Sequence, residues 1–107
     1  MMIGWIGVDL DGTLAVYDGW KGVDHIGDPV PLMLERVKVW VASGIPVKIF
    51  TARVCEGDVA VEPIKKWCKE HIGRELEVTN VKDFAMIELW DDRCVTVIPN
   101  TGVSIGR

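Results

Sequence analysis

The stretch that decides the fold is residues 3–13, which read IGWIGVDLDGT. Its first six residues form a short apolar run with two glycines, a pattern typical of a buried parallel strand. The run ends at Asp9 and Asp11, and Gly12 then lets the chain turn sharply. Two carboxylates that follow a buried strand are costly unless they are paired or bind a cation. The stretch therefore predicts a strand that carries a functional acidic site at its carboxyl end.

Strand and helix patterns alternate along the rest of the chain. Apolar residues at helical spacing predict two helices, from Asp28-Pro29 to Ser43-Gly44 and from Pro63 to Gly73. Further strands are expected at residues 47–50, 76–79, 86–90 and 95–98. Strands joined by helical crossovers pair in parallel. We therefore expect a three-layer, doubly wound (Rossmann-like) α/β fold around a mostly parallel five-stranded sheet.

Residues 14–27 differ from the rest of the chain because they are rich in glycine and polar residues. Asp18-Gly19, between Tyr17 and Trp20, is a favoured two-residue hairpin turn. We expect a small exposed flap at residues 14–27.

Composition and charge exclude several classes of protein. The 107 residues weigh 11.9 kDa and are expected to form one domain, residues 1–107. The content of 49% hydrophobic and 26% charged residues is typical of a soluble globular domain. A net charge of -4 does not indicate a nucleic-acid partner, and no apolar run approaches the roughly 20 residues of a membrane span. Three widely spaced cysteines match no disulfide or zinc pattern, so we expect reduced thiols and a cytoplasmic location.

A second acidic pair, Asp91 and Asp92, follows the strand expected at residues 86–90. The carboxyl ends of parallel strands meet at one edge of a sheet, where ligands bind at a switch in strand order. Thr51 and Lys82 follow the second and third expected strands and would lie at the same edge. The sequence thus predicts that four strand ends converge on one crevice.

The charges favour a cation in this crevice. Setting aside Asp9, Asp11, Asp91 and Asp92 leaves 12 acidic and 12 basic residues, so these four acids account for the net charge of -4. Two carboxylates about 4 Å apart repel each other by roughly 4 kcal/mol at an effective dielectric constant of 20. Oxygen ligands with room for water favour Mg²⁺ over zinc or copper.

Asp-x-Asp-Gly-Thr at residues 9–13, followed in order by Thr51, Lys82 and Asp91-Asp92, resembles the four motifs of the haloacid dehalogenase (HAD) superfamily, specifically its phosphatases. The resemblance spans nearly the whole chain, and Asp-x-Asp-Gly-Thr is its most specific element. The family's usual cap domain has no room in residues 14–27 or in the short loop between Thr51 and Pro63, so the chain is similar to a minimal, capless type. The resemblance implies Mg²⁺-dependent hydrolysis of a phosphomonoester.

The resemblance also implies a role for each matching residue. Asp9 would be the nucleophile that forms an aspartyl phosphate, and Asp11 would be the general acid and base. Thr51 and Lys82 would bind the phosphoryl oxygens. The implied metal ligands are Asp9, Asp11 through its backbone carbonyl, and Asp91 and Asp92 directly or through water.

A looser similarity links the tripeptides TAR at 51–53 and DDR at 91–93 to the phosphatase domain of phage polynucleotide kinases. Arg53 is therefore a candidate phosphate contact, and a nucleotide or nucleic-acid phosphate is a candidate substrate. Since no segment could close over a small ligand, we expect a large substrate or a second subunit to cover the crevice. Tyr17 and Trp20 are candidate contacts in either case.

Two alternatives belong to other functional classes. A phosphoacceptor module resembling response-regulator receivers also uses acids, Thr and Lys on a doubly wound sheet, but receivers place the acid pair first and the accepting Asp on a middle strand. A catalytically silent relative could bind partners through the flap. Turnover of a phosphate ester separates both alternatives from an enzyme.

Overall fold

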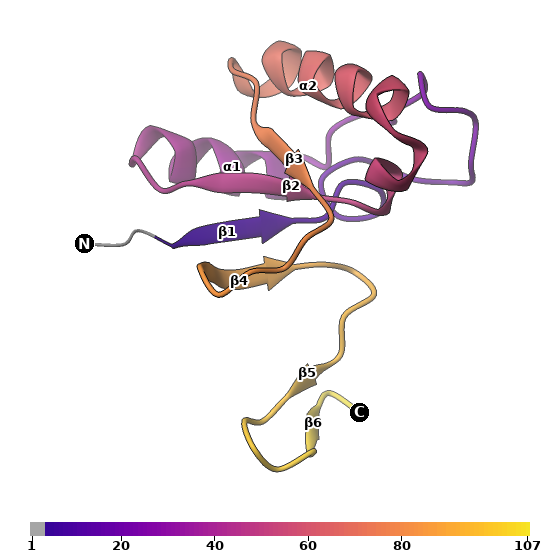
Figure 1. Cartoon of the computed structure of the whole chain (residues 1–107). Coiled ribbons are helices and arrows are strands. Elements are labelled where there is room, and N and C mark those ends of the chain that lie inside the picture. Colours follow the sequence, from indigo (N-terminus) through magenta and orange to yellow (C-terminus); the bar gives the residue numbers. More distant parts are fainter. Residues whose placement is uncertain (1–3) are drawn as a thin grey trace.

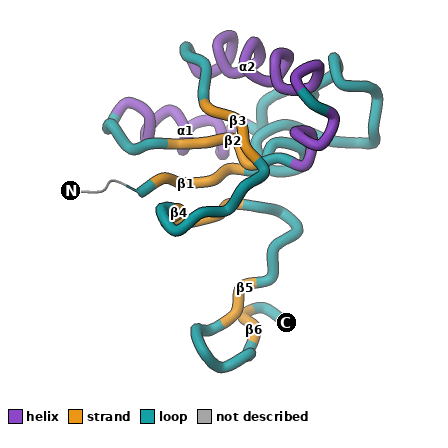
Figure 2. Tube along the Cα trace, viewed as in Figure 1, coloured by secondary structure: helices purple, strands orange, loops and turns teal. Residues whose placement is uncertain are grey.

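The computed structural model describes residues 4–107, so Ile3 of the expected first strand lies outside the described part. The elements in chain order are β1 (Trp5–Val8), α1 (Pro31–Ala42), β2 (Val47–Phe50), the 3-10 helix η1 (Ala52–Glu56), α2 (Asp58–Ile72), β3 (Glu77–Thr79), β4 (Met86–Trp90), β5 (Thr96–Val97) and β6 (Ser104–Ile105). Figures 1 and 2 show α1 and α2 grouped beside β2 and β3, with β5 and β6 far below β4.

The main sheet has the strand order β3-β2-β1-β4, and every pair of neighbouring strands in it is parallel. The chain runs outward from β1 to β3 and then returns to the other side of β1, so the strand order switches between β1 and β4. The Asp9 amide donates to the Trp90 carbonyl at 2.9 Å, which holds the carboxyl ends of β1 and β4 together. The prediction of a parallel α/β sheet is confirmed.

The core lies between this sheet and the two helices. Alternate residues of β1 and β2 face the helices, because neighbouring side chains in a strand point to opposite faces. The buried cluster combines strand residues Ile6, Val8, Val47 and Ile49 with helix residues Met33, Val37, Ile64 and Trp67. The helices contact each other, and right-handed crossovers in one direction place both on one face of the sheet. No helix within residues 4–107 is long and apolar enough to cross a membrane.

The opposite face of the sheet, called the open face below, is crossed by residues 80–85 between β3 and β4. The Trp5 indole Nε1 donates to an Asp83 carboxylate oxygen at 2.8 Å, and the Lys48 Nζ lies 4.5 Å from the centre of a Trp5 ring. The connection holds no helix in the described chain, so the expected third layer is not confirmed.

The expected fifth strand does not join the main sheet. Within residues 95–98, Thr96 and Val97 form β5, which pairs antiparallel with β6 in a separate two-stranded sheet. The reversal lies at residues 99–102, Pro-Asn-Thr-Gly, and Asn100 has a φ of 66°. These residue types favour a tight turn, so local pairing replaces the expected place in the main sheet.

The flap at residues 14–27 is an irregular loop rather than a hairpin. Its base is closed because the Val16 amide donates to the Asp28 carbonyl at 2.8 Å and the Val30 amide donates to the Leu14 carbonyl at 2.7 Å. Pro29 forms an isolated bridge with Ala15. Because Pro29 belongs to this closure, α1 begins at Pro31 instead of Asp28-Pro29.

The second helix begins earlier than predicted. It starts at Asp58, and Pro63 lies inside it. The amides of Ala60 and Val61 already donate to the Gly57 carbonyl, at 3.0 and 3.4 Å, so a first turn forms before the proline. Pro63 therefore costs the helix one hydrogen bond without marking its start. The predicted end at Gly73 is confirmed by its left-handed conformation, with a φ of 99°.

Two valines on α1 test the position of the core. Val37 is fully buried and Val39 is 54% exposed, on the same helix. We expect Val37→Ala to lower the free energy of unfolding by about 2 kcal/mol, because it removes buried methyl groups and leaves a cavity. Val39→Ala should change it by less than about 0.5 kcal/mol. Urea denaturation of both variants measures the difference, and equal losses would contradict the packing described.

Candidate active site

A cleft of about 860 Å³ lies at the carboxyl edge of the sheet, next to the switch in strand order. It brings together eight of the nine side chains expected at the site. These are Asp9, Asp11, Tyr17, Trp20, Thr51, Arg53, Asp91 and Asp92. Lys82 is the exception: it is exposed on the connection between β3 and β4 and does not line the cleft.

Three carboxylates form an acidic cluster in the cleft. Asp9 follows β1, Asp91 and Asp92 follow β4, and one oxygen from each lies within 4.8 Å of the others. This all-oxygen set fits a hard divalent cation such as Mg²⁺. The side chain of Asp11 lies outside this cluster and contacts Arg53 instead. The expected contribution of Asp11 to the metal site, through its backbone carbonyl, stays a prediction.

Thr13 connects the two ends of the cluster. Its hydroxyl oxygen lies 3.3 Å from an Asp9 carboxylate oxygen and 3.1 Å from one of Asp92, and it accepts a hydrogen bond from the Asp92 amide at 3.0 Å. The single hydroxyl hydrogen can donate to either carboxylate. This role of Thr13 was not predicted from the sequence, although its place in the Asp-x-Asp-Gly-Thr motif is a signal that could have led to it.

Residue 12 must be glycine because the Asp92 side chain lies so close to it. Its φ of 92° is strained for any residue with a side chain, and a Cβ there would lie 2.6 Å from an Asp92 carboxylate oxygen. A substitution would therefore disturb both the turn and the cluster.

The pKa of Asp9 is raised from 3.8 to about 7. The largest cause is burial, followed by a side-chain hydrogen bond with Asp92 and by the negative charges of Asp91 and Asp92. The Thr13 hydroxyl opposes the shift by stabilising the carboxylate. Without a metal ion, the cluster thus retains a proton near neutral pH, and a bound cation would displace it.

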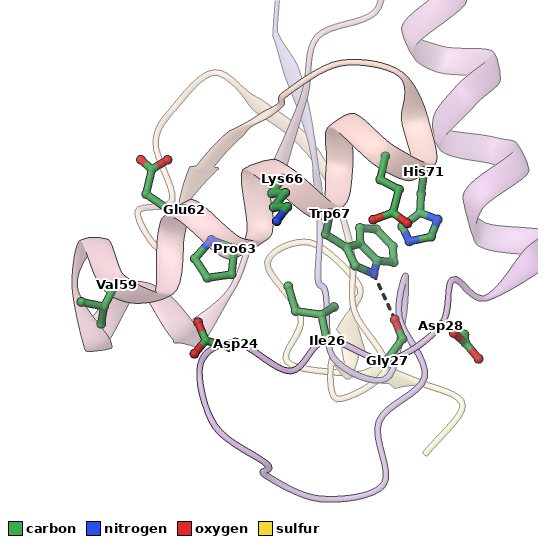
Figure 3. A pocket seen from close by; sticks show the side chains of 11 residues that line it. Asp24, Ile26, Gly27, Asp28, Val59, Glu62, Pro63, Lys66, Trp67 and His71 are labelled. Atoms are coloured by element: carbon green, nitrogen blue, oxygen red, sulfur yellow. Dashed lines mark hydrogen bonds between the residues drawn. The ribbon is translucent and has the colours of Figure 1, made fainter.

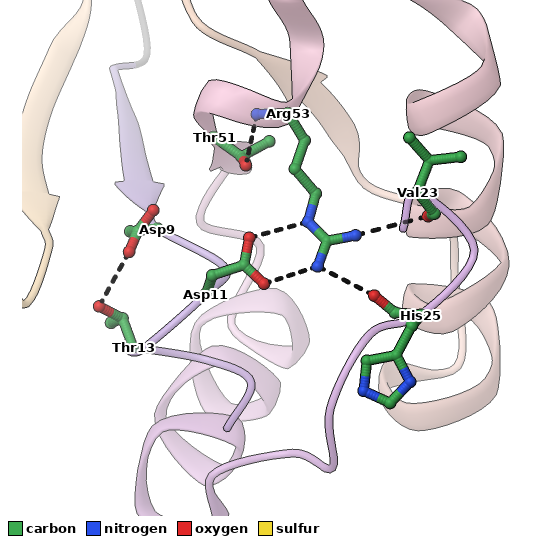
Figure 4. A network of polar contacts seen from close by, with 7 residues as sticks. All are labelled: Asp9, Asp11, Thr13, Val23, His25, Thr51 and Arg53. Atoms are coloured by element: carbon green, nitrogen blue, oxygen red, sulfur yellow. Dashed lines mark hydrogen bonds and ion pairs between the residues drawn. The ribbon is translucent and has the colours of Figure 1, made fainter. Parts of the chain in front are cut away.

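Asp11 forms a two-point ion pair with Arg53 (Figure 4). The guanidinium Nε and Nη2 donate to the two Asp11 carboxylate oxygens, each at 2.8 Å. The Arg53 side chain is only 5% exposed, so this pair is well shielded from water. Arg53 is therefore engaged with the expected general acid, rather than presented to a phosphate as the sequence analysis expected.

Arg53 also holds the loop of residues 14–27. Its guanidinium donates to the carbonyl oxygens of Val23 at 3.4 Å and His25 at 3.0 Å, and lies 4.9 Å from the centre of the Trp20 ring. One side chain thus joins the loop, the cleft and Asp11. Sequence reasoning gave Arg53 a different role, because no local pattern marks a contact made across the fold.

Thr51 lies where the sequence predicts, at the end of β2, and is 3% exposed. Its hydroxyl accepts a hydrogen bond from the Arg53 amide at 3.1 Å and caps η1. The hydroxyl hydrogen is then available to donate to a ligand in the cleft. Asn80, which directly follows β3, lines the cleft where Lys82 was expected.

A second hollow, of about 900 Å³, lies between residues 24–28 and α2 (Figure 3). The Trp67 indole Nε1 donates to the Gly27 carbonyl at 3.0 Å, and the Trp67 and His71 rings lie 4.6 Å apart. The hydrogen bond fastens the loop to α2, and the ring contact lies within the helix. None of the nine expected site residues lines this hollow, so the candidate chemistry belongs to the cleft at the sheet edge.

Comparisons with known proteins give a structural neighbour and no family. No protein-family model and no curated protein matches the chain. A solved structure of a conserved protein from Bacteroides thetaiotaomicron is similar, with a TM-score of 0.65 and 25% sequence identity over 92% of this chain and 84% of that one. The description of that protein names no activity, so this likeness supports the fold alone.

The raised pKa of Asp9 predicts a pH dependence of stability in metal-free buffer. Between about pH 4 and pH 7 the folded chain keeps a proton that the unfolded chain has released, so this residue's contribution to stability falls as the pH rises. We expect the melting temperature of the wild type, relative to that of Asp9→Asn, to fall across this range.

Glu35→Gln, which removes an exposed carboxylate on α1, is the matched control and should keep the wild-type pH profile of the melting temperature. Differential scanning fluorimetry in excess chelator measures all three proteins. A constant difference between wild type and Asp9→Asn from pH 4 to pH 7 would show that Asp9 is not held in a proton-binding cluster.

Proposed function

We propose that the protein is a Mg²⁺-dependent phosphomonoester hydrolase that forms an aspartyl phosphate on Asp9. The observation that carries this proposal is the convergence of Asp9, Asp91 and Asp92 at the switch in strand order, in one cleft with Thr51. The resemblance of these residues and their order to HAD phosphatases supports the same reaction.

The first step uses Asp9 as the nucleophile. A carboxylate oxygen of Asp9 attacks phosphorus, the ester P–O bond breaks, and the leaving oxygen departs with the bonding electron pair and takes a proton from protonated Asp11. The Thr51 hydroxyl donates to a phosphoryl oxygen. Mg²⁺, held by the carboxylate oxygens of the acidic cluster, would offset the repulsion between Asp9 and the anionic ester.

The second step regenerates the enzyme. Water attacks phosphorus, its proton passes to ionised Asp11, and the bond between Asp9 and phosphorus breaks to release phosphate. Ionised Asp11, the form that accepts this proton, is also the form that makes the ion pair with Arg53. Protonation removes the charge attraction to Arg53, so Asp11 can turn to the next leaving oxygen. The ion pair is therefore compatible with both roles.

The cleft favours a phosphomonoester with a planar or large leaving group. Its walls include the aromatic rings of Tyr17, Trp20 and Phe50, and the first two are about half exposed. Aromatic walls can stack on a planar group such as a nucleobase. A nucleotide, or the phosphorylated end of a nucleic acid, fits these walls, although a net charge of -4 gives no general attraction for a long polyanion.

A phosphoacceptor module is the second candidate function. The observation that favours it is the two-point contact of Asp11 with Arg53, which occupies both oxygens of the group needed to activate water. If Asp11 stays in this contact, the phosphate on Asp9 would be long-lived. A phosphorylated protein that persists after the phosphate donor is removed would identify this function.

The cysteines support a cytoplasmic location for this activity. Cys55, Cys68 and Cys94 are all free thiols. Unpaired cysteines, two of them exposed, suit a reducing compartment.

Replacing the proposed nucleophile tests the reaction. We expect Asp9→Asn to lower hydrolysis of an aryl phosphate by about 1,000-fold or more, because an amide cannot form the acyl phosphate. Wild-type activity should also disappear in excess chelator and return with Mg²⁺. Glu35→Gln again serves as the control for expression and folding. Activity that survives either the substitution or the chelator would refute the proposed mechanism.

The ion pair between Arg53 and Asp11 has its own test. Arg53→Lys keeps the positive charge but cannot make the two-point contact, so we expect kcat to fall by about 10-fold or more. Arg74→Lys, an exposed position beyond α2, is the matched control. Steady-state kinetics with acid-quench measurement of phosphorylated protein shows which step slows. An unchanged kcat would mean that the ion pair does not support turnover.

A further inference from the structure

Residues 93–107, called the arm below, carry β5 and β6 and extend away from the main sheet (Figures 1 and 2). In the described chain, the hydrogen bonds of residues 95–107 stay within that segment, as between the Ile98 amide and the Val103 carbonyl at 2.8 Å. Within residues 4–107, β5 and β6 pack on each other and on no further helix or strand extensively. A two-stranded hairpin alone is marginally stable in water, so the arm calls for a partner surface.

The size of the folded chain also indicates that a partner covers part of its surface. Its radius of gyration is 14.2 Å, against about 13 Å for a compact chain of this length. Its accessible surface is 7015 Å², against about 6,000 Å² for a compact monomer of this mass. The excess of about 1,000 Å² is close to the roughly 800 Å² that each partner buries in a standard interface.

The exposed surface of the arm is apolar. Its five large aliphatic side chains are between 41% and 59% exposed: Val95, Val97, Ile98, Val103 and Ile105. The main sheet offers a matching surface. The outer edge of β4 has no neighbouring strand in the described chain, and beside it Ile87 is 62% exposed and Phe84 is fully exposed. An unpaired sheet edge is a template for another strand.

The charges favour docking between two copies of the chain. All 16 acidic residues lie within residues 1–92, together with 10 basic residues, so that part has a formal charge of -6. The arm contains Arg93 and Arg107 and no acidic residue, a formal charge of +2. Arg93 lines the cleft of its own chain, so Arg107 is the charge that the arm presents to the negative body of another molecule.

We propose that the arm docks on the β4 edge and the adjoining open face of a second copy of this chain, in a two-fold symmetric dimer. The free edge of β5 adds to β4 of the partner and gives that sheet a fifth strand. The exchange is reciprocal, so each sheet gains a strand and each arm is covered. This assembly is independent of the proposed phosphatase activity.

Sedimentation velocity over a wide concentration range tests the proposal. We expect the wild type to sediment at twice the 11.9 kDa mass of one chain. Val97→Asp/Ile105→Asp should raise the dissociation constant by about 100-fold or more, because docking would bury unpaired charges. Val39→Asp, at an equally exposed valine on α1, is the matched control and should remain dimeric.

Amide hydrogen exchange locates the interface. Residues 86–90 should exchange more slowly in the wild-type dimer than in the Val97→Asp/Ile105→Asp variant. If Val97→Asp/Ile105→Asp folds poorly, Val95→Asp/Val103→Asp replaces it and should show the same faster exchange at residues 86–90. A monomeric wild type overturns the proposal, whether it stays alone or binds another protein or a lipid vesicle. A dimer that survives both arm variants, or leaves exchange at β4 unchanged, also overturns it.

Discussion

The parallel pairing of β1 with β4 is the constraint on which the rest of the site depends. It continues one residue past the strands, through the hydrogen bond from the Asp9 amide to the Trp90 carbonyl, and so brings Asp9 beside Asp91 and Asp92. The three carboxylates repel one another, and the backbone hydrogen bonds between β1 and β4 hold them together. Folding therefore supplies the free energy that keeps the cluster assembled.

The rest of the cleft offsets this unfavourable charge in two ways. Thr13 lies between two of the carboxylates and offers them a hydroxyl, and the chain can approach so closely only because residue 12 is glycine. Arg53 neutralises Asp11 separately, which keeps the fourth carboxylate out of the cluster. The site thus divides into a three-carboxylate part suited to a cation and a separate ion pair of Asp11 with Arg53.

Sequence reasoning succeeded where one local pattern decides the outcome. Residues 47–50 and 86–90 are the strands it predicted, because short apolar runs between turn residues leave few alternatives. It failed at Pro63, where a proline is tolerated inside a helix, and at residues 95–98, where pairing depends on which partner edge is within reach. The position of Thr51 was predicted from the strand that it follows. The contacts of Arg53 join segments far apart in the chain and leave no local signal.

Arg53 links Asp11 to the loop of residues 14–27. The same guanidinium binds ionised Asp11 and the carbonyl oxygens of Val23 and His25. In the proposed reaction, Asp11 is ionised only between the two steps. The guanidinium would therefore hold the loop most firmly while the aspartyl phosphate exists, and less firmly when the ester enters and when phosphate leaves.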